Sequence, residues 1–286
     1  MTFAIGRDVP VHICAELGQN HNGSLAMAKK LILAAKEAGV DSVKFQKRSP
    51  ALCVPASMVE TMRETPWGIM TYLAYRERLE FSVEQYREID AYCKELAIPW
   101  FASIWDVSSL VALKENFPDL PAYKVPSAML TNVELLRTLK RREVPIILST
   151  GMSTMEQIEA AVGLLRYQGN RLVLCHCNST YPCPVTDLNL RCIKTLRHWF
   201  PDVVVGYSGH EVGLATTLAA VALGSRYVER HLTLDRSMWG TDQAASIEPV
   251  GLRRLVKDIR NIERALGDGI KRVTEAEIAV MKRLRP

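Results

Sequence analysis

The stretch Pro-Ile-Ile-Leu-Ser-Thr (145–150) is a short apolar run that ends on two hydroxyl side chains, and a helical pattern over Ser153–Tyr167 follows it. A strand followed directly by a helix is typical of parallel α/β architecture. The same unit recurs along the chain. The predicted strands are 11–17, 41–46, 98–103, 121–125, 145–149, 171–176, 203–208 and 226–231. The predicted helices are Ser24–Ala38, Ser82–Leu96, Val107–Asn116, Asn132–Leu139, Ser153–Tyr167, Leu188–Phe200, Val212–Leu223 and Val250–Ala265.

Eight strands, each followed by a helix, predict an α/β fold of the (β/α)8 TIM barrel type, in a single domain over residues 1–286. A chain of this length fits one barrel better than two packed domains. Residues 265–286 are expected to form a C-terminal extension with a short helix rich in Lys and Arg. The connection 47–81 is unusually long, and long βα loops usually carry function or contacts. We therefore expect it to cover the barrel mouth or to meet a neighbouring subunit.

The composition is that of an ordinary globular protein, with 48% hydrophobic and 23% charged residues. The net charge of +5 is scattered among acidic residues, which indicates attraction for small anions and argues against nucleic-acid binding. No apolar stretch in the sequence is long enough to span a membrane, and because a strand-like run follows Met1-Thr2-Phe3 almost at once, we expect no signal peptide. Seven irregularly spaced cysteines predict reduced thiols in a cytoplasm. In Cys175-His176-Cys177, strand alternation separates the imidazole from the thiols, which favours thiols that fill the barrel wall.

Lys44 and Lys124 lie at the ends of the second and fourth predicted strands. The carboxyl ends of barrel strands meet at one mouth, and alternate strands contribute to the same layer. Two ammonium groups there would repel each other unless an anion, such as a phosphate or a carboxylate, lay between them. Ser127 and Ser149 add neutral donors, and Gly151 allows a backbone amide to approach an anion closely. These residues predict an anion site at the mouth.

His210 and His231 end the seventh and eighth predicted strands, which are adjacent in a barrel. Two neighbouring imidazoles can bind a divalent ion and leave positions open for water and substrate. Glu16, at the end of the first strand, either ligates the ion or orients a water beside it. Asp242, in the loop after the last strand, is a candidate acid or base, or a simple turn residue. The sequence thus predicts a divalent-metal site beside the anion site.

Seven stretches form a family pattern that extends over nearly the whole chain in a constant order. They are Ala-Glu-Leu-Gly-Gln-Asn-His-Asn-Gly (15–23), Val-Lys-Phe-Gln (43–46), Tyr-Lys-Val-Pro-Ser (123–127), Ile-Leu-Ser-Thr-Gly-Met (147–152), Tyr-Ser-Gly-His (207–210), Glu-Arg-His-Leu-Thr-Leu-Asp (229–235) and Gly-Thr-Asp-Gln-Ala-Ala-Ser (240–246). With them the chain resembles the sialic acid synthase family, whose enzymes condense phosphoenolpyruvate with an N-acylhexosamine.

The resemblance implies a homodimeric barrel whose mouth holds phosphoenolpyruvate, an amino-sugar acceptor and Mn²⁺ or Mg²⁺. His210 and His231 would be the metal ligands, and Glu16 would hold a metal-bound water near the sugar aldehyde. Glu16, His231 and Asp242 are the candidate catalytic residues. Phosphoenolpyruvate would be held by Lys44, Lys124, Ser127, Ser149 and Ser208. The acceptor side would include Gln46, Ser179, Tyr181 and Asp242.

Departures from the family pattern lie mainly on the acceptor side. No antifreeze-like domain, which in the family contributes an arginine to the partner subunit's site, follows Pro286. Met129 stands where the family has an acidic residue, and Ser179 where it has an asparagine. Ile104 replaces a threonine near the end of the third strand. The donor half of the site is therefore better supported than the acceptor half, and N-acetylmannosamine is the default acceptor.

The expected reaction is a metal-dependent condensation that gives a sialic-acid-like nonulosonic acid and phosphate. Two alternatives stay open. A Schiff-base aldolase would use Lys44 or Lys124 as nucleophile, which requires a lysine with a lowered pKa and no metal. The second alternative is a barrel that binds a sugar phosphate without catalysing a reaction. The presence of Glu16, His210 and His231 argues against this alternative.

Overall fold

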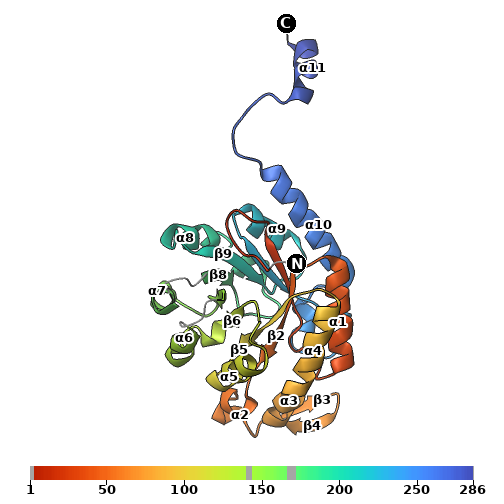
Figure 1. Cartoon of the computed structure of the whole chain (residues 1–286), viewed down its shortest axis with the longest axis vertical. Helices are drawn as coiled ribbons and strands as arrows, with labels where there is room; N and C mark the ends of the chain where they lie inside the picture. The colour runs from red at the N-terminus through yellow and green to blue at the C-terminus, as the bar shows by residue number, and fades with distance from the viewer. Residues whose placement is uncertain (1–2, 140–143, 166–171, 286) are drawn as a thin grey trace.

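The computed structural model describes residues 3–139, 144–165 and 172–285, which form a closed parallel barrel surrounded by helices (Figure 1). The strand order is β1-β10-β9-β8-β7-β6-β5-β2, and β1 pairs with both β2 and β10. This arrangement confirms the predicted TIM barrel. The barrel strands are β1 His12–Glu16, β2 Ser42–Lys47, β5 Trp100–Ile104, β6 Tyr123–Val125, β7 Ile146–Ser149, β8 Leu172–Cys177, β9 Val204–Gly209 and β10 Tyr227–His231.

The outer helices match the predicted helices closely, except that α8 begins four residues later than Leu188. In α1 the Ser24 side chain accepts from the Met27 amide, and Gly39 ends the helix at a φ of 86° that favours glycine. Predicted helix residues 166–167 and the predicted strand start at 171 lie outside the described residues. The helices are α1 Leu25–Ala38, α4 Val83–Glu95, α5 Val107–Asn116, α6 Val133–Leu139, α7 Met155–Leu165, α8 Cys192–Trp199, α9 Ala215–Ala222 and α10 Pro249–Leu266.

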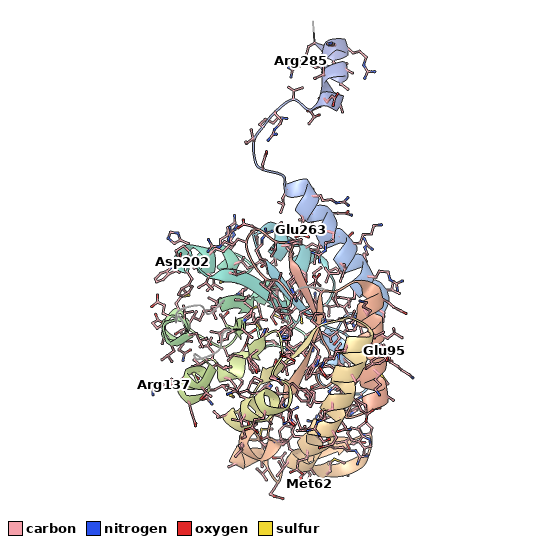
Figure 2. All side chains as sticks on the ribbon, viewed as in Figure 1. Met62, Glu95, Arg137, Asp202, Glu263 and Arg285 are labelled. Atoms are coloured by element: carbon pink, nitrogen blue, oxygen red, sulfur yellow. The ribbon has the colours of Figure 1, made fainter. Side chains whose placement is uncertain are left out.

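The long connection after β2 contains elements that the sequence did not predict. They are α2 Pro50–Cys53, the antiparallel strands β3 Met62–Thr65 and β4 Gly68–Thr71, and α3 Tyr72–Leu79. The segment packs against the loop after β10, because the ring of Trp239 lies 5.4 Å from that of Tyr75 and 6.0 Å from that of Trp67. It therefore lies over the carboxyl ends of the strands. Met62, in this segment, is labelled at the lower tip of the molecule in Figure 2.

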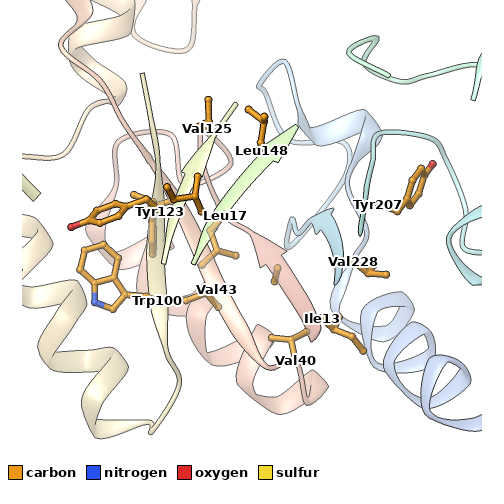
Figure 3. Close-up of a cluster of buried hydrophobic side chains, with 14 of the residues drawn as sticks. Ile13, Leu17, Val40, Val43, Trp100, Tyr123, Val125, Leu148, Tyr207 and Val228 are labelled. Atoms are coloured by element: carbon orange, nitrogen blue, oxygen red, sulfur yellow. The ribbon is translucent and has the colours of Figure 1, made fainter. Parts of the chain in front are cut away.

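Two groups of buried apolar side chains hold the barrel together. One lies between the strands and the helices, and Figure 3 shows Ile13, Val43 and Val228 as part of it. The other fills the barrel interior with Phe101, Ile147 and neighbouring residues. Burial of each large apolar side chain stabilises the fold by about 1.5–3 kcal/mol. Tyr227 belongs to the inner group, and its hydroxyl donates to Glu229 at the level where polar side chains begin.

The last described helix, α11 Glu275–Leu284, follows an exposed linker and lies apart from the barrel at the end opposite β3 and β4 (Figure 1). Arg285 is labelled at this end in Figure 2. Across the described part of the chain, every helix is too short or too polar to cross a bilayer.

Candidate active site

One cavity of about 180 Å³ at the carboxyl ends of the strands is lined by all the predicted site residues except Asp242. The strand register explains the convergence, because Glu16 on β1 is aligned with both Lys44 on β2 and His231 on β10. The predicted residues that line the cavity are Glu16, Lys44, Gln46, Lys124, Ser127, Ser149, Ser179, Tyr181, Ser208, His210 and His231. The sequence thus located the cavity, although the role of each residue is a separate question.

The two lysines share a carboxylate of the protein itself. Glu229 lies between them, with Oε2 3.1 Å from Lys124 Nζ and Oε1 3.5 Å from Lys44 Nζ. Lys44 also forms a direct ion pair with Glu16. All four side chains are 5% exposed or less. The sequence predicted an anion between the two ammonium groups, and in the structure the carboxylate of Glu229 lies there.

Burial and charge act in opposite directions on this cluster. Burial would raise the pKa of Glu229, but the ammonium groups of Lys124 and Lys44 hold it well below its usual range. Burial lowers the pKa of Lys44. Burial acts to lower the pKa of Lys124, but the charge and hydrogen bond of Glu229, together with Cys175 and Cys177, raise it above its ordinary value. With both carboxylates ionised, Glu16 and Glu229 balance the charges of the two lysines.

Hydroxyl groups surround the lysine cluster. Lys44 donates to Ser103 Oγ at 2.6 Å, and Ser208 Oγ donates to Glu229 Oε1 at 3.2 Å. The amide of Gly151, predicted to approach an anion, donates to Ser127 Oγ at 3.1 Å. A Cβ at Gly151 would overlap the hydroxyls of Ser179 and Ser127, so a larger residue here would require both serine side chains to move. Lys44, Lys124 and Ser208, which could bind an oxyanion, therefore already donate to groups of the protein.

His210 and His231 lie side by side, with ring centroids 5.4 Å apart, and the ring of Tyr181 packs 4.0 Å from that of His210. His210 Nδ1 donates to the Asn178 carbonyl at 2.6 Å, which leaves Nε2 available. Among the residues that the structure describes, the buried Nδ1 of His231 has no hydrogen-bond partner, and it lies 3.6 Å from Asp242 Oδ2. Burial, with His210 and Lys44 nearby, lowers the pKa of His231 well below its ordinary value and so favours the neutral imidazole that metals bind.

This pair of imidazoles fits a divalent ion that takes its remaining ligands from water and substrate. Within residues 3–139, 144–165 and 172–285, no group of three or more His, Cys, Asp or Glu is arranged to hold an ion. The buried Nδ1 of His231, which has no hydrogen-bond partner among the described residues, is the atom that supports the fit.

Several cavity residues were missed by sequence reasoning. Glu229, Ser103 and Trp105 line the cavity, and so does Cys177, whose Sγ lies 3.9 Å from His210 Nδ1. The expected alternation in β8 is confirmed, since His176 bonds the Leu188 carbonyl away from the cavity. Cys177, however, contacts the site and does more than fill the barrel wall. The period of two in β10 was an available signal, because it places Glu229 on the face of His231.

Comparisons with known proteins agree with this geometry. The model of the NeuB family matches residues 31–271. The chain belongs to the NeuB family. N-acetylneuraminate-9-phosphate synthase from Homo sapiens is 38% identical over 98% of this chain and 78% of its own length. N,N'-diacetyllegionaminic acid synthase from Campylobacter jejuni is 36% identical over 93% of this chain and 80% of its own length.

Solved structures support the same assignment. One is the crystal structure of N-acetylneuraminic acid synthetase from Leptospira borgpetersenii in complex with citrate, which superposes with a TM-score of 0.86 at 30% sequence identity. The match covers 100% of this chain and 97% of the Leptospira chain. A truncated 3-deoxy-D-arabino-heptulosonate 7-phosphate synthase from Thermotoga maritima has a TM-score of 0.66 at 14% identity, which shows a shared fold alone. The predictions of an enzyme and of this family are confirmed.

Proposed function

We propose that this protein condenses phosphoenolpyruvate with an open-chain N-acylhexosamine and produces a sialic-acid-like nonulosonic acid and inorganic phosphate. The relatives support this, because their names describe synthases of N-acetylneuraminate 9-phosphate, N,N'-diacetyllegionaminic acid and pseudaminic acid. The observation that carries the proposal is one cavity that joins a lysine pair to a histidine pair. N-acetylmannosamine is the default sugar.

The charge balance of the cavity supports a divalent ion as part of the enzyme. Phosphoenolpyruvate carries a carboxylate and a phosphate, whereas Lys44 and Lys124 already face Glu16 and Glu229. The donor therefore requires positive charge beyond the lysine pair. We assign His210 and His231 as ligands of Mn²⁺ or Mg²⁺, which when bound supplies a Lewis acid for the sugar aldehyde.

The residues of the chain have the following roles in the proposed reaction. Lys44, Lys124 and the serine hydroxyls hold the donor while its carbon 3 attacks the aldehyde carbon, which forms the new C–C bond. The aldehyde oxygen becomes a hydroxyl by accepting a proton, for which Asp242 is the candidate donor because burial raises its pKa. Water oriented by Glu16 then adds to carbon 2 of the donor.

The last step releases phosphate and balances the reaction. One proton of the added water passes to Glu16, which leaves a hydroxyl on carbon 2 beside the phosphate ester. The bond between carbon 2 and the phosphate oxygen then breaks, and the departing phosphate takes the proton of that hydroxyl. Carbon 2 becomes a ketone, and the phosphate leaves with its bridging oxygen. Lys124, whose ammonium form is favoured by Glu229, stabilises the negative charge of the departing group.

A panel of N-acylhexosamines tests the proposal. The protein is mixed with phosphoenolpyruvate, Mn²⁺ and each sugar, phosphate release is followed, and the product acid is identified by mass spectrometry. Release with at least one sugar, and its loss on chelation with EDTA, is the expected result. Silence across the panel would instead favour a binding barrel without catalysis.

One observation favours the Schiff-base aldolase as a second candidate. Burial lowers the pKa of Lys44, as a nucleophilic lysine requires. The ion pair of Lys44 with Glu16 opposes this role, because it keeps the amine in its ammonium form. Borohydride treatment in the presence of substrate separates the two, since a trapped adduct on Lys44 and activity that survives EDTA would establish the aldolase.

Three sequence-based expectations stay predictions within this proposal. They are a homodimer with contacts through residues 47–81, a cytoplasmic location, and a single domain in which 265–286 form an extension.

A further inference from the structure

A basic hollow lies at the end of the barrel opposite the active-site cavity. It has a volume of about 590 Å³ and lies where the amino-terminal ends of β9 and β10 meet the end of α8 (Figure 1). The charged and ring side chains that line it are Arg7, Lys194, Arg197, His198 and Arg226. The acidic residues nearest to these in the chain, Asp8 and Asp202, do not line the hollow. Because the chain has 31 acidic and 36 basic residues, four cations around one hollow are a local excess of positive charge.

No carboxylate of the described residues forms an ion pair with these four cations. Their hydrogen bonds go to backbone carbonyls instead. Arg226 Nε donates to the Arg7 carbonyl at 2.9 Å, and Arg7 donates to the Val203 carbonyl at 3.4 Å. Arg197 donates to the Leu223 carbonyl at 3.3 Å. Each guanidinium carries five N–H donors, so most of them stay available to a ligand.

Helix stability explains only part of this cluster. Lys194, Arg197 and His198 are spaced three and four residues apart, so they lie on one face of α8. Cations in the last turn of a helix are favoured by the helix dipole, which accounts for Arg197 and His198. Lys194 lies in the first turn, where the same dipole disfavours a cation, and Arg197 adds like-charge repulsion. An anion shared by these side chains accounts for the position of Lys194.

Two of the arginines are fixed in place by the fold. A Cβ at Gly224 would overlap the guanidinium of Arg197, so the glycine lets this group pack against the backbone that follows α9. Arg226 is half-buried, and both its Nε and its Nη2 donate to the Arg7 carbonyl. Side chains that are already ordered lose less entropy when a ligand binds. The hollow is therefore organised to hold an anion before the anion arrives.

We propose that the basic hollow binds the phosphate chain of a small oligophosphate, either a nucleoside triphosphate or inorganic triphosphate. Guanidinium forks match phosphate oxygens in geometry, and a lysine adds a compact charge. The cations converge from three segments of the chain, so they suit a ligand that carries several negative charges close together. The volume also lies within the range of about 300–1,000 Å³ that is typical of small-ligand sites.

This site is distinct from the site of the proposed condensation and does not depend on it. Val203 and Arg226 immediately precede β9 and β10, whereas His210 follows β9 and His231 ends β10. The two sites therefore lie at opposite ends of the same two strands. An oligophosphate in the hollow does not compete with phosphoenolpyruvate, and it stabilises the folded protein against unfolding.

Calorimetric titration with inorganic triphosphate, ATP and inorganic phosphate tests the inference. The variants are Lys194→Glu and the control Lys30→Glu, which changes the net charge equally at an exposed position of α1. Lys194 forms no hydrogen bond within the part of the chain that the structure describes. The helix dipole also favours an acidic residue in the first turn, so Lys194→Glu is expected to fold normally.

The native protein should bind triphosphate and ATP about tenfold more tightly than phosphate, or better. The tighter of the two identifies the source of the phosphate chain. Lys194→Glu should weaken both about tenfold or more, whereas Lys30→Glu should leave both unchanged. Thermal unfolding is the second readout. Triphosphate should raise the melting temperature of the native protein and of Lys30→Glu, with little effect on Lys194→Glu at the same concentration.

Four results would overturn the inference. Equal weakening by both substitutions would mean that net charge, and not the hollow, attracts the anion. Displacement of triphosphate by phosphoenolpyruvate, with Lys194→Glu unaffected, would place the anion in the active-site cavity. Tighter binding of a single-stranded oligonucleotide than of triphosphate would assign the hollow to nucleic acid. Absence of binding of both triphosphate and ATP to the native protein would leave no oligophosphate site.

Discussion

Replacement of Glu229 by glutamine tests how the protein keeps two lysines buried together. The new side chain has nearly the same shape but only one oxygen that accepts, so it keeps the hydrogen bond from either Tyr227 or Ser208 and places an NH2 group at the other position. The change removes the charge and one of these two acceptors. Lys124 then loses the carboxylate that it contacts at 3.1 Å. Lys44 keeps its ion pair with Glu16. The variant thus leaves the cavity with one more positive than negative charge.

The expected cost follows from the geometry of the pair. Removal of one partner of a buried ion pair costs about 3–5 kcal/mol, because the other charge stays buried. Since Glu16 still pairs with Lys44, we expect about 3 kcal/mol for Glu229→Gln. For a chain of this size the melting temperature changes by about 2 °C per kcal/mol, which corresponds to a decrease of about 6 °C.

The pH dependence has a definite sign. The pKa of Glu229 is lowered in the folded state, so its contribution to stability is present above the ordinary carboxyl pKa. The contribution is lost as the pH falls through the lowered folded value. The difference in melting temperature between the native protein and Glu229→Gln should therefore be largest near neutral pH and shrink on acidification.

Thermal unfolding with and without phosphoenolpyruvate is the assay. Because the variant has an unbalanced ammonium group, the anion should stabilise it more than it stabilises the native protein. Tyr227→Phe is the matched control, since it removes the 2.7 Å hydrogen bond to Glu229 but keeps the charge. It should lower stability without the additional response to the anion. Equal stabilisation of Glu229→Gln and the native protein would refute the charge argument.

Three further substitutions test the site and its support. Loss of a residue that hydrogen-bonds to a metal ligand weakens metal binding about 10–100-fold, and His231→Ala, which removes a ligand itself, should weaken Mn²⁺ binding by more than that. The variant should lose turnover but still bind phosphoenolpyruvate, and calorimetric titration would measure both affinities. Lys124→Ala should raise the KM of phosphoenolpyruvate about ten- to a hundredfold; unchanged donor affinity would mean that the phosphate lies elsewhere. Arg230→Met leaves Glu211 buried without the guanidinium that now lies 3.0 Å away, and should lower the free energy of unfolding by about 3–5 kcal/mol in urea. A loss below about 1 kcal/mol would contradict this last expectation.

The sequence predicted the barrel because its signals are local. Apolar strands, a capping Ser24 and a terminal Gly39 act within a few residues of one another, and the structure contains all eight predicted strands. The strands β3 and β4 were missed, because they form a small sheet away from the barrel and their segment packs against Trp239 far along the chain. Gly68, with a φ of 101°, was the local signal for that turn.

Sequence reasoning placed the lysines and histidines in one cavity because strand ends converge in any barrel of this type. Sequence reasoning did not recognise the role of Glu229. Strand alternation predicts which face of the sheet a side chain lies on, but it does not predict which side chains of other strands it contacts across the barrel. The structure supplies that missing relation. An ammonium group inside a protein requires a counter-charge whether or not substrate is present, so Lys124 and Lys44 face a carboxylate of the protein. A lysine pair at a barrel mouth therefore does not by itself balance a phosphorylated donor. The balance must come from groups without an internal counter-ion, which is why the histidine pair matters as much as the lysines.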